Sequence, residues 1–114
     1  MTIFRHFIKK STNEISLMEA DQILRDQPDS AILLDVRSDE EWKEGHLSGA
    51  LYIPHDQIRQ RAKEEFPQGK PLFVYCRSGH RAGLAKKDLE KLGFNDVHNV
   101  GGILDYEWDL VGDE

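Results

Sequence analysis

Residues Pro71 to Arg81 are Pro-Leu-Phe-Val-Tyr-Cys-Arg-Ser-Gly-His-Arg. The first five form a short, continuously apolar run, which is typical of a strand buried on both faces of a parallel sheet. The run passes directly into a turn containing Gly79, and a helix is predicted to begin within about six residues of Cys76. A buried strand that leads through a turn into a helix is the repeating unit of α/β folds.

The same alternation continues on both sides of this stretch. Further apolar runs predict strands at 31–36, 50–53 and 97–100. Helices are predicted between the strands, and two of them begin at capping-box spacings, Ser16 with Glu19 and Ser38 with Glu41. We therefore predict an α/β domain with a mainly parallel central sheet of about five strands, four of which are placed here, and with helices on both faces.

Length and charge limit the classes of protein to consider. The chain has 114 residues and a formal net charge of −6, which suits one domain with one hydrophobic core. The negative charge disfavours nucleic acid or an anionic membrane as the main partner, and no run approaches the roughly 20 apolar residues of a membrane span. We predict an N-terminal arm at 1–13, a single domain at 14–114 and a cytoplasmic location.

Cys76 is the only cysteine of the chain. This count excludes an intramolecular disulfide, a Cys-x-x-Cys pair and a cysteine-rich zinc site, and the histidines lack metal-ligand spacing, so no metal or cofactor is predicted. A lone cysteine is most often a small buried hydrophobe. Here, however, Gly79 can adopt a positive φ and let successive amide groups converge at the start of a helix, which makes an anion site next to the sulfur.

The side chains after Cys76 favour a thiolate that meets an anionic substrate. Arg77, His80 and Arg81 place two fixed cations and one titratable group within five residues of the sulfur, and such surroundings favour the thiolate. Phosphoryl (or arsenate) transfer and sulfur transfer both use this arrangement. Cysteine phosphatases resemble Cys-x5-Arg, because their loop must surround three outer oxygens, whereas only four residues separate Cys76 from Arg81. The shorter loop favours sulfur transfer, provided that its amides point at the sulfur and that solvent reaches the thiol.

The loop Cys76–Ala82 resembles the active-site loop of the rhodanese (thiosulfate sulfurtransferase) family. Two other parts of the chain are similar to the family's flanking signatures. These are Leu33–Arg37 with Glu40–Trp42 and Gly45–Ala50 upstream, and Gly93-Phe94 with Val100–Gly102 and Trp108 downstream. The resemblance covers about residues 14 to 109, and the short length resembles the single-domain bacterial members.

The resemblance implies a two-step sulfur transfer. Cys76 attacks the outer sulfur of an anionic donor such as thiosulfate, and the resulting persulfide passes its sulfur to cyanide or a thiol. Because the chain has no second cysteine, the acceptor is an outside molecule, either a small one or a sulfur-acceptor protein. Family members that use mercaptopyruvate usually have a small neutral residue directly after the cysteine, whereas this chain has Arg77. The resemblance therefore favours a dianionic donor such as thiosulfate.

The resemblance also implies roles for further residues. The loop residues that hold the donor and the persulfide are Arg77, Ser78, Gly79, His80 and Arg81, with the two arginines attracting the donor and the backbone amides forming the cradle. His80 either tunes the local charge or only borders the entrance. Asp35, Arg37 and His46 are expected to support the site, through a charge pair and hydrogen bonds, rather than to react.

Other interpretations stay open at this point. A persulfide relay protein would use the same Cys76 chemistry but take its specificity from protein contacts. A cysteine-dependent phosphatase or arsenate reductase is disfavoured by the loop length, and a silent regulatory module is disfavoured by the presence of Cys76. Glu40 and Glu41 are expected to be solvated helix residues, and Trp42 and Trp108 packing residues.

Overall fold

The computed structural model describes residues 15–105, 108 and 110–112 of the chain. The expected N-terminal arm at 1–13 lies outside the described residues. The elements follow one another as α2 (Leu17–Asp26), β1 (Ile32–Asp35), α3 (Asp39–Glu44), β2 (Leu51–Tyr52), η1 (His55–Gln57), α4 (Ile58–Glu65), β3 (Leu72–Cys76), α5 (His80–Lys91), β4 (Val97–Gly102) and η2 (Ile103–Asp105). Strands and helices therefore alternate as predicted.

Both predicted capping boxes are present. The Ser16 hydroxyl accepts a hydrogen bond from the Glu19 amide (3.1 Å), and the Glu19 carboxylate accepts one from the Ser16 amide (2.9 Å). Ser38 and Glu41 form the same reciprocal pair at the start of α3. These bonds satisfy amides that have no partner within the first turn of a helix, and so they fix where α2 and α3 begin.

The central sheet is parallel and has the order β2-β1-β3-β4. It contains four strands among the described residues, so the expected count of about five is too high. The reason is that the described chain has four apolar runs of strand character, and each forms one strand. Outside the sheet, the described residues also form an isolated antiparallel bridge between His46 and Val111.

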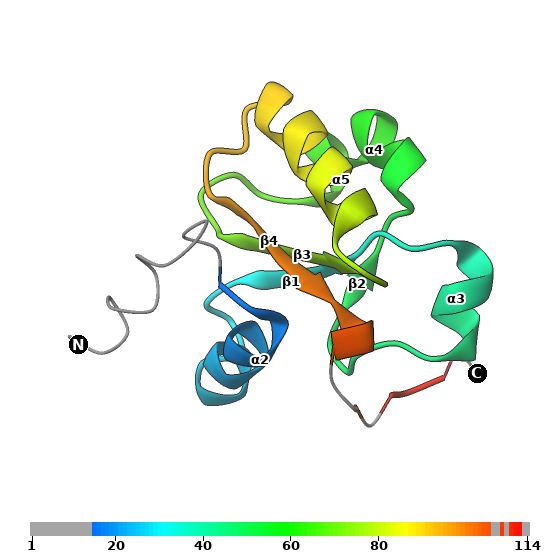
Figure 1. Cartoon of the computed structure of the whole chain (residues 1–114). Coiled ribbons are helices and arrows are strands. Elements are labelled where there is room, and N and C mark those ends of the chain that lie inside the picture. Colours follow the sequence, from blue (N-terminus) through cyan, green and yellow to red (C-terminus); the bar gives the residue numbers. More distant parts are fainter. Residues whose placement is uncertain (1–14, 106–107, 109, 113–114) are drawn as a thin grey trace.

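Helices cover both faces of the sheet, as Figure 1 shows: α4 and α5 lie on one face and α2 on the other. Each face buries its own apolar cluster. Leu34, Val74 and Cys76 point into the cluster under α4 and α5, whereas Leu33 and Tyr75 point into the cluster under α2. This is the alternation expected of strands buried on both sides. It also places Cys76 beneath α5, with α3 at the same end of the sheet.

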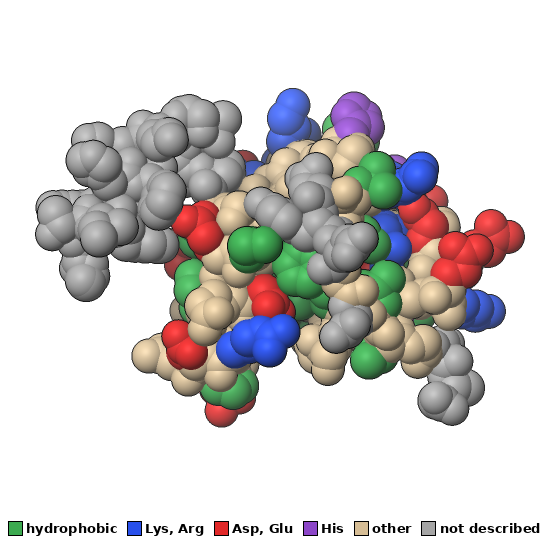
Figure 2. Space-filling model, turned by 60° about the horizontal axis from the view of Figure 1, so that its bottom comes forward, with side chains coloured by type: hydrophobic (Ala, Val, Ile, Leu, Met, Phe, Trp, Pro, Cys, Tyr) green, Lys and Arg blue, Asp and Glu red, His purple; other side chains and the backbone are tan. Residues whose placement is uncertain are grey.

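The surface carries mixed charge on the face shown in Figure 2. Acidic and basic side chains are interspersed there, with apolar side chains between them, so this face presents no continuous basic surface. No helix within the described residues is both long enough and apolar enough to cross a membrane. The cytoplasmic location remains a prediction.

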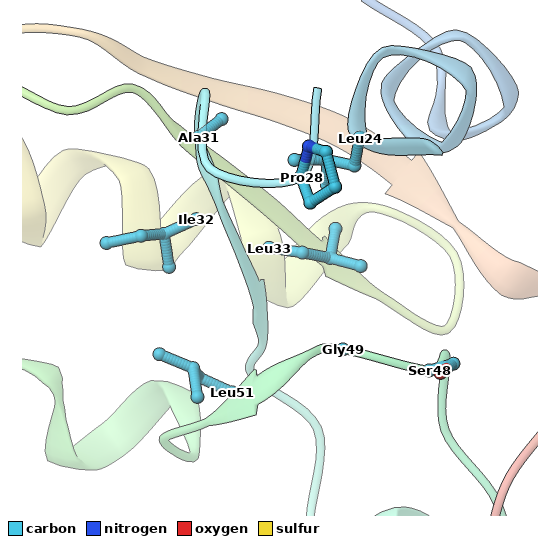
Figure 3. Close-up of a pocket in the computed structure, with 8 residues that line it drawn as sticks. All are labelled: Leu24, Pro28, Ala31, Ile32, Leu33, Ser48, Gly49 and Leu51. Atoms are coloured by element: carbon cyan, nitrogen blue, oxygen red, sulfur yellow. The ribbon is translucent and has the colours of Figure 1, made fainter. Parts of the chain in front are cut away.

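A hollow of about 360 Å³ lies at the amino ends of β1 and β2 (Figure 3). Its lining is mainly apolar, with Leu24, Ile32, Leu33 and Leu51 among the contributing side chains. Cys76 ends β3, at the opposite end of the strands. The hollow therefore belongs to a different part of the molecule from the cysteine loop, and it contains no titratable side chain among its lining residues.

Candidate active site

Cys76 is the last residue of β3, and α5 begins four residues later at His80. Gly79 precedes α5 with a φ of 104°, in the left-handed region that glycine adopts without strain. This conformation turns the Gly79 amide back toward the sulfur. The Gly79 amide lies 2.9 Å from Sγ of Cys76, and the Ala82 amide lies 3.4 Å from it.

The two amides form the cradle that the sequence predicts around the sulfur, with one difference in its extent. The predicted cradle spans the amides of Arg77 to Arg81, whereas the second observed donor is Ala82, in the first turn of α5. Both donors belong to the amino end of a helix, where backbone amides and the helix dipole favour negative charge. The sulfur thus faces two backbone donors at the start of a helix.

The second requirement, access from solvent, is not met in this conformation. Cys76 is only 1% exposed. Its side chain packs in the apolar cluster beneath α5, and the loop closes over it. A donor can reach Sγ only when the loop or its neighbours shift. The expectation that solvent reaches the thiol is therefore wrong for this conformation.

Arg81 is held by a carboxylate instead of facing an open anion site. Its guanidinium forms a two-pronged ion pair with Glu41 on α3, with N–O distances of 2.7 and 3.0 Å. The hydrogen bonds from Arg81 lower the pKa of Glu41 to about 2, helped by hydrogen bonds from Ser38 and opposed by burial. The expectation that Glu41 is merely solvated is wrong, because this carboxylate joins α3 to α5 across the loop.

The Glu41–Arg81 pair predicts a specific pH dependence of stability. A carboxyl whose pKa is lowered by folding contributes stability that is complete above its ordinary value of 4.5 and is lost as the pH falls toward about 2. At neutral pH, Glu41→Gln is expected to reduce the free energy of unfolding by about 1 kcal/mol, because glutamine keeps the capping box but loses the ion pair. The difference from the wild type should disappear near pH 2.

Denaturant unfolding of both proteins between pH 7 and pH 2 measures this effect. Glu40→Gln is the matched control, because Glu40 is an exposed neighbour on the same helix. A constant difference between wild type and Glu41→Gln across this range would contradict the assignment of the shifted carboxyl to the ion pair.

The other loop side chains face outward. Arg77, Ser78 and His80 are exposed. The Arg77 carbonyl accepts a hydrogen bond from the Leu104 amide (3.2 Å), which ties the loop to the segment after β4. Of the two loop arginines, Arg77 is thus exposed, whereas Arg81 is half-buried in its ion pair with Glu41.

Asp35 and Arg37 form the charge pair that the sequence analysis expects. The Arg37 guanidinium donates to both carboxylate oxygens of Asp35, at 2.7 to 3.0 Å, and also to the Gly45 carbonyl (2.7 Å). Asp35 is fully buried and Arg37 is 4% exposed. Burial acts against the charge of Arg37, but its bonds to Asp35 outweigh that effect and raise its pKa above the usual value. The pair joins the end of β1 to the end of α3.

His46 is hydrogen-bonded to the end of α3, and its role in supporting the site stays a prediction. Its Nδ1 donates to the Trp42 carbonyl (2.8 Å), and its ring stacks on Trp42 with centroids 3.3 Å apart. The next residue, Leu47, donates its amide to the Tyr75 hydroxyl (3.1 Å). Burial and the nearby Asp35 carboxylate raise the pKa of Tyr75. These contacts anchor the chain after α3 against β3, directly before Cys76.

The sequence analysis missed two residues of β4 that contact the loop. Asn99 donates a hydrogen bond to the Gly79 carbonyl (3.0 Å). Gly102 packs so closely that a Cβ there would lie 2.0 Å from the Arg77 carbonyl oxygen. The Gly101-Gly102 pair was a visible signal of a close backbone approach, but nothing in the sequence indicates which segment approaches it.

Within the described residues, no group of three or more His, Cys, Asp and Glu side chains could hold a metal ion.

Fold and site together define a parallel α/β domain that presents one cysteine in a short amide-lined loop at the carboxyl end of its sheet. Residues 16–107 match the model of the rhodanese-like domain, and the chain belongs to that family. The family includes sulfurtransferases, in agreement with the resemblance of the loop and its flanking motifs.

Two curated relatives illustrate the range of the family. The candidate sulfur carrier protein YrkF of Bacillus subtilis is 35% identical over 108 residues, covering 86% of this chain and 57% of YrkF. Thiosulfate sulfurtransferase PspE of Escherichia coli is 34% identical over 73 residues, covering 63% of this chain and 70% of PspE. The chain thus spans little more than half the length of YrkF.

Solved structures agree with the fold. A rhodanese-like domain protein from Staphylococcus aureus superposes with a TM-score of 0.76 at 25% identity, covering 88% of this chain and 97% of that one. A rhodanese with anions from E. coli superposes with a TM-score of 0.66 at 31% identity, covering 73% and 99%. The parallel sheet with helices on both faces is therefore the architecture of this family.

Proposed function

We propose that this protein is a sulfurtransferase that carries a sulfane sulfur on Cys76, from an anionic donor such as thiosulfate to a thiol or cyanide. The observation that carries the proposal is the convergence of the Gly79 and Ala82 amides on Sγ at the start of α5. The family includes sulfurtransferases, and the four-residue spacing between Cys76 and Arg81 leaves little room for a phosphoryl group.

The transfer proceeds in two displacements. The Cys76 thiolate attacks the outer sulfur of thiosulfate, an S–S bond forms, and the bond to the sulfonate sulfur breaks with its electron pair leaving on sulfite. The terminal sulfur of the persulfide now carries the negative charge, which the loop amides stabilise. An acceptor thiolate or cyanide then attacks that terminal sulfur, and the Cys76 thiolate leaves. Arg77 supplies the charge that draws the donor to the loop.

Intact-mass measurement tests the proposal directly. After incubation with thiosulfate, the wild type is expected to gain the mass of one sulfur atom, and cyanide or excess thiol should remove it. Cys76→Ser should show no gain, because serine cannot form a persulfide. Release of phosphate from an aryl phosphate, without any sulfur adduct, would replace the proposal by the phosphatase interpretation.

A persulfide relay is the second candidate, because the relative YrkF is named as a candidate sulfur carrier. It uses the same Cys76 persulfide but receives its sulfur from a protein donor. Steady-state assays separate the two functions. A relay would load from a desulfurase with its cysteine substrate while turning over thiosulfate and cyanide no faster than Cys76→Ser, whereas the proposed enzyme turns over the small molecules.

A further inference from the structure

A bulge in β4 directs one side chain at the cysteine loop. The strands β3 and β4 are in register as far as Val74 with Asn99, and then Tyr75 pairs with Gly101, so that Val100 is an extra residue. A bulge bends the strand and re-aims neighbouring side chains, and bulges are over-represented next to active sites. The residue at this bend, on the side of the sheet that faces α5, is Asn99.

The carboxamide of Asn99 connects the bulge to the loop. Its Oδ1 accepts a hydrogen bond from the Gly101 amide (2.9 Å), and its Nδ2 donates to the Gly79 carbonyl (3.0 Å). A backbone amide can only donate and a carbonyl can only accept, so the two bonds leave a single orientation for the carboxamide. Asn99 is therefore bound to its own strand through Oδ1 and to the loop through Nδ2.

Glycines surround this carboxamide and let it approach. A Cβ on Gly83, in the first turns of α5, would lie 3.4 Å from Nδ2 of Asn99. A Cβ on Gly79 would lie 3.5 Å from the Gly101 Cα. The loop, the start of α5 and the bulge of β4 therefore meet around Asn99, and its amide group reaches the Gly79 carbonyl without competition from bulky side chains.

The hydrogen bond from Asn99 to Gly79 is important because the Gly79 amide also donates to the sulfur of Cys76. Its amide is the closer of the two donors to Cys76 Sγ, at 2.9 Å. Its carbonyl accepts from both the Gly83 amide (3.1 Å) and Asn99. Glycine has the widest choice of backbone conformations of any residue, so a glycine that must aim an amide at one atom needs an external constraint. The Asn99 side chain provides it.

We propose that Asn99 is a positioning residue for sulfur transfer: it clamps the Gly79 carbonyl, and through it keeps the Gly79 amide directed at the sulfur of Cys76. The inference rests on the proposed function of Cys76 and adds a residue outside the loop to its machinery. Asn99 does not touch the reacting atoms. It acts through the backbone of Gly79.

Asn99→Ala is expected to slow persulfide formation from thiosulfate about tenfold in single-turnover measurements. Removing an oxyanion donor outright costs an enzyme about a hundredfold or more, and here the donor is loosened rather than removed. The effect should fall on kcat more than on KM, because Arg77 still attracts the donor. Asn99→Asp should lose at least as much, since a carboxylate has the same shape but no hydrogen to donate to the Gly79 carbonyl.

Amide hydrogen exchange, followed by NMR, tests the clamp independently of activity. In the wild type the Gly79 amide should be protected, and Cys76→Ser should shift its resonance because the acceptor changes. In Asn99→Ala the Gly79 amide should exchange at least about tenfold faster, while amides in the middle of α5 keep their protection. Asn95→Ala is the matched control, because Asn95 is exposed and precedes the same strand.

Each outcome decides the proposal. Faster Gly79 exchange together with slower persulfide formation supports it. Unchanged Gly79 exchange in Asn99→Ala overturns the clamp, whatever the activity, and faster exchange with an unchanged rate of persulfide formation overturns the positioning role. If the wild type forms no persulfide at all, the proposed function fails, and the exchange measurement still decides whether Asn99 holds Gly79.

Discussion

Gly102→Ala is expected to destabilise the protein by about 3 kcal/mol or more and to reduce sulfur transfer by about a hundredfold. The added Cβ would lie 2.0 Å from the Arg77 carbonyl oxygen and 2.6 Å from the Ser78 Cα. These are backbone atoms, so no side-chain rotation relieves the overlap. Either β4 or the loop must move, and a loop displaced by about 1 Å no longer directs its amides at Cys76.

Thermal unfolding and a single-turnover assay measure the two effects. For a domain of this size, a loss of 3 kcal/mol lowers Tm by more than about 10 °C. Gly112→Ala is the matched control, since its added Cβ would have no neighbour closer than 4.0 Å. Wild-type Tm and activity in Gly102→Ala would show that β4 and the loop do not pack as closely as described.

Arg37→Met is expected to cost about 3 to 5 kcal/mol, a large part of the stability of an ordinary domain. Methionine replaces the packing of the arginine stem but leaves the fully buried Asp35 carboxylate without its guanidinium. The charge of Asp35 then loses its ion-pair partner and keeps the hydrogen bond from the amide of residue 37, in an environment that solvates it poorly. Most of the lost stability therefore comes from leaving the Asp35 carboxylate buried without its ion-pair partner, and less comes from losing the Asp35–Arg37 contact itself.

A double variant tests this reason and keeps the experiment informative if Arg37→Met fails to fold. Asp35→Asn with Arg37→Met removes both charges and should recover part of the lost stability, measured by denaturant unfolding. Arg59→Met is the matched control, because the Arg59–Asp88 pair is on the surface, with Arg59 68% exposed, and should cost no more than about 1 kcal/mol. Equal losses for the two arginines would contradict the importance of burial.

Local patterns were sufficient to predict most of the fold. The apolar run before Cys76 predicts a strand buried on both faces, and the serine–glutamate spacings at 16 and 38 predict two helix starts, because these signals depend on neighbours within four residues. Gly79 could be recognised as the point where the chain turns back on the sulfur for the same reason. The charge pair of Asp35 with Arg37 is also local, since only one residue lies between them.

The parts of the site that were missed depend on distant segments. Glu41 meets Arg81 across 40 positions, and Asn99 meets Gly79 across 20; no pattern within one segment signals such a pairing. The bulge that aims Asn99 arises from the register between two strands, which single-strand periodicity does not reveal. The burial of Cys76 was missed because it depends on how tightly the loop packs against the helix and the sheet beside it.

The loop that surrounds Cys76 is contacted by segments that lie before and after it in the sequence. Residues 35–41 precede it, and residues 99–102 follow it by some twenty positions. A nascent polypeptide that has emerged only through α5 contains Cys76 but lacks Asn99 and Gly102, which contact its loop. On the proposed function, a chain truncated before β4 would therefore keep the thiol but lose the two contacts that hold its loop.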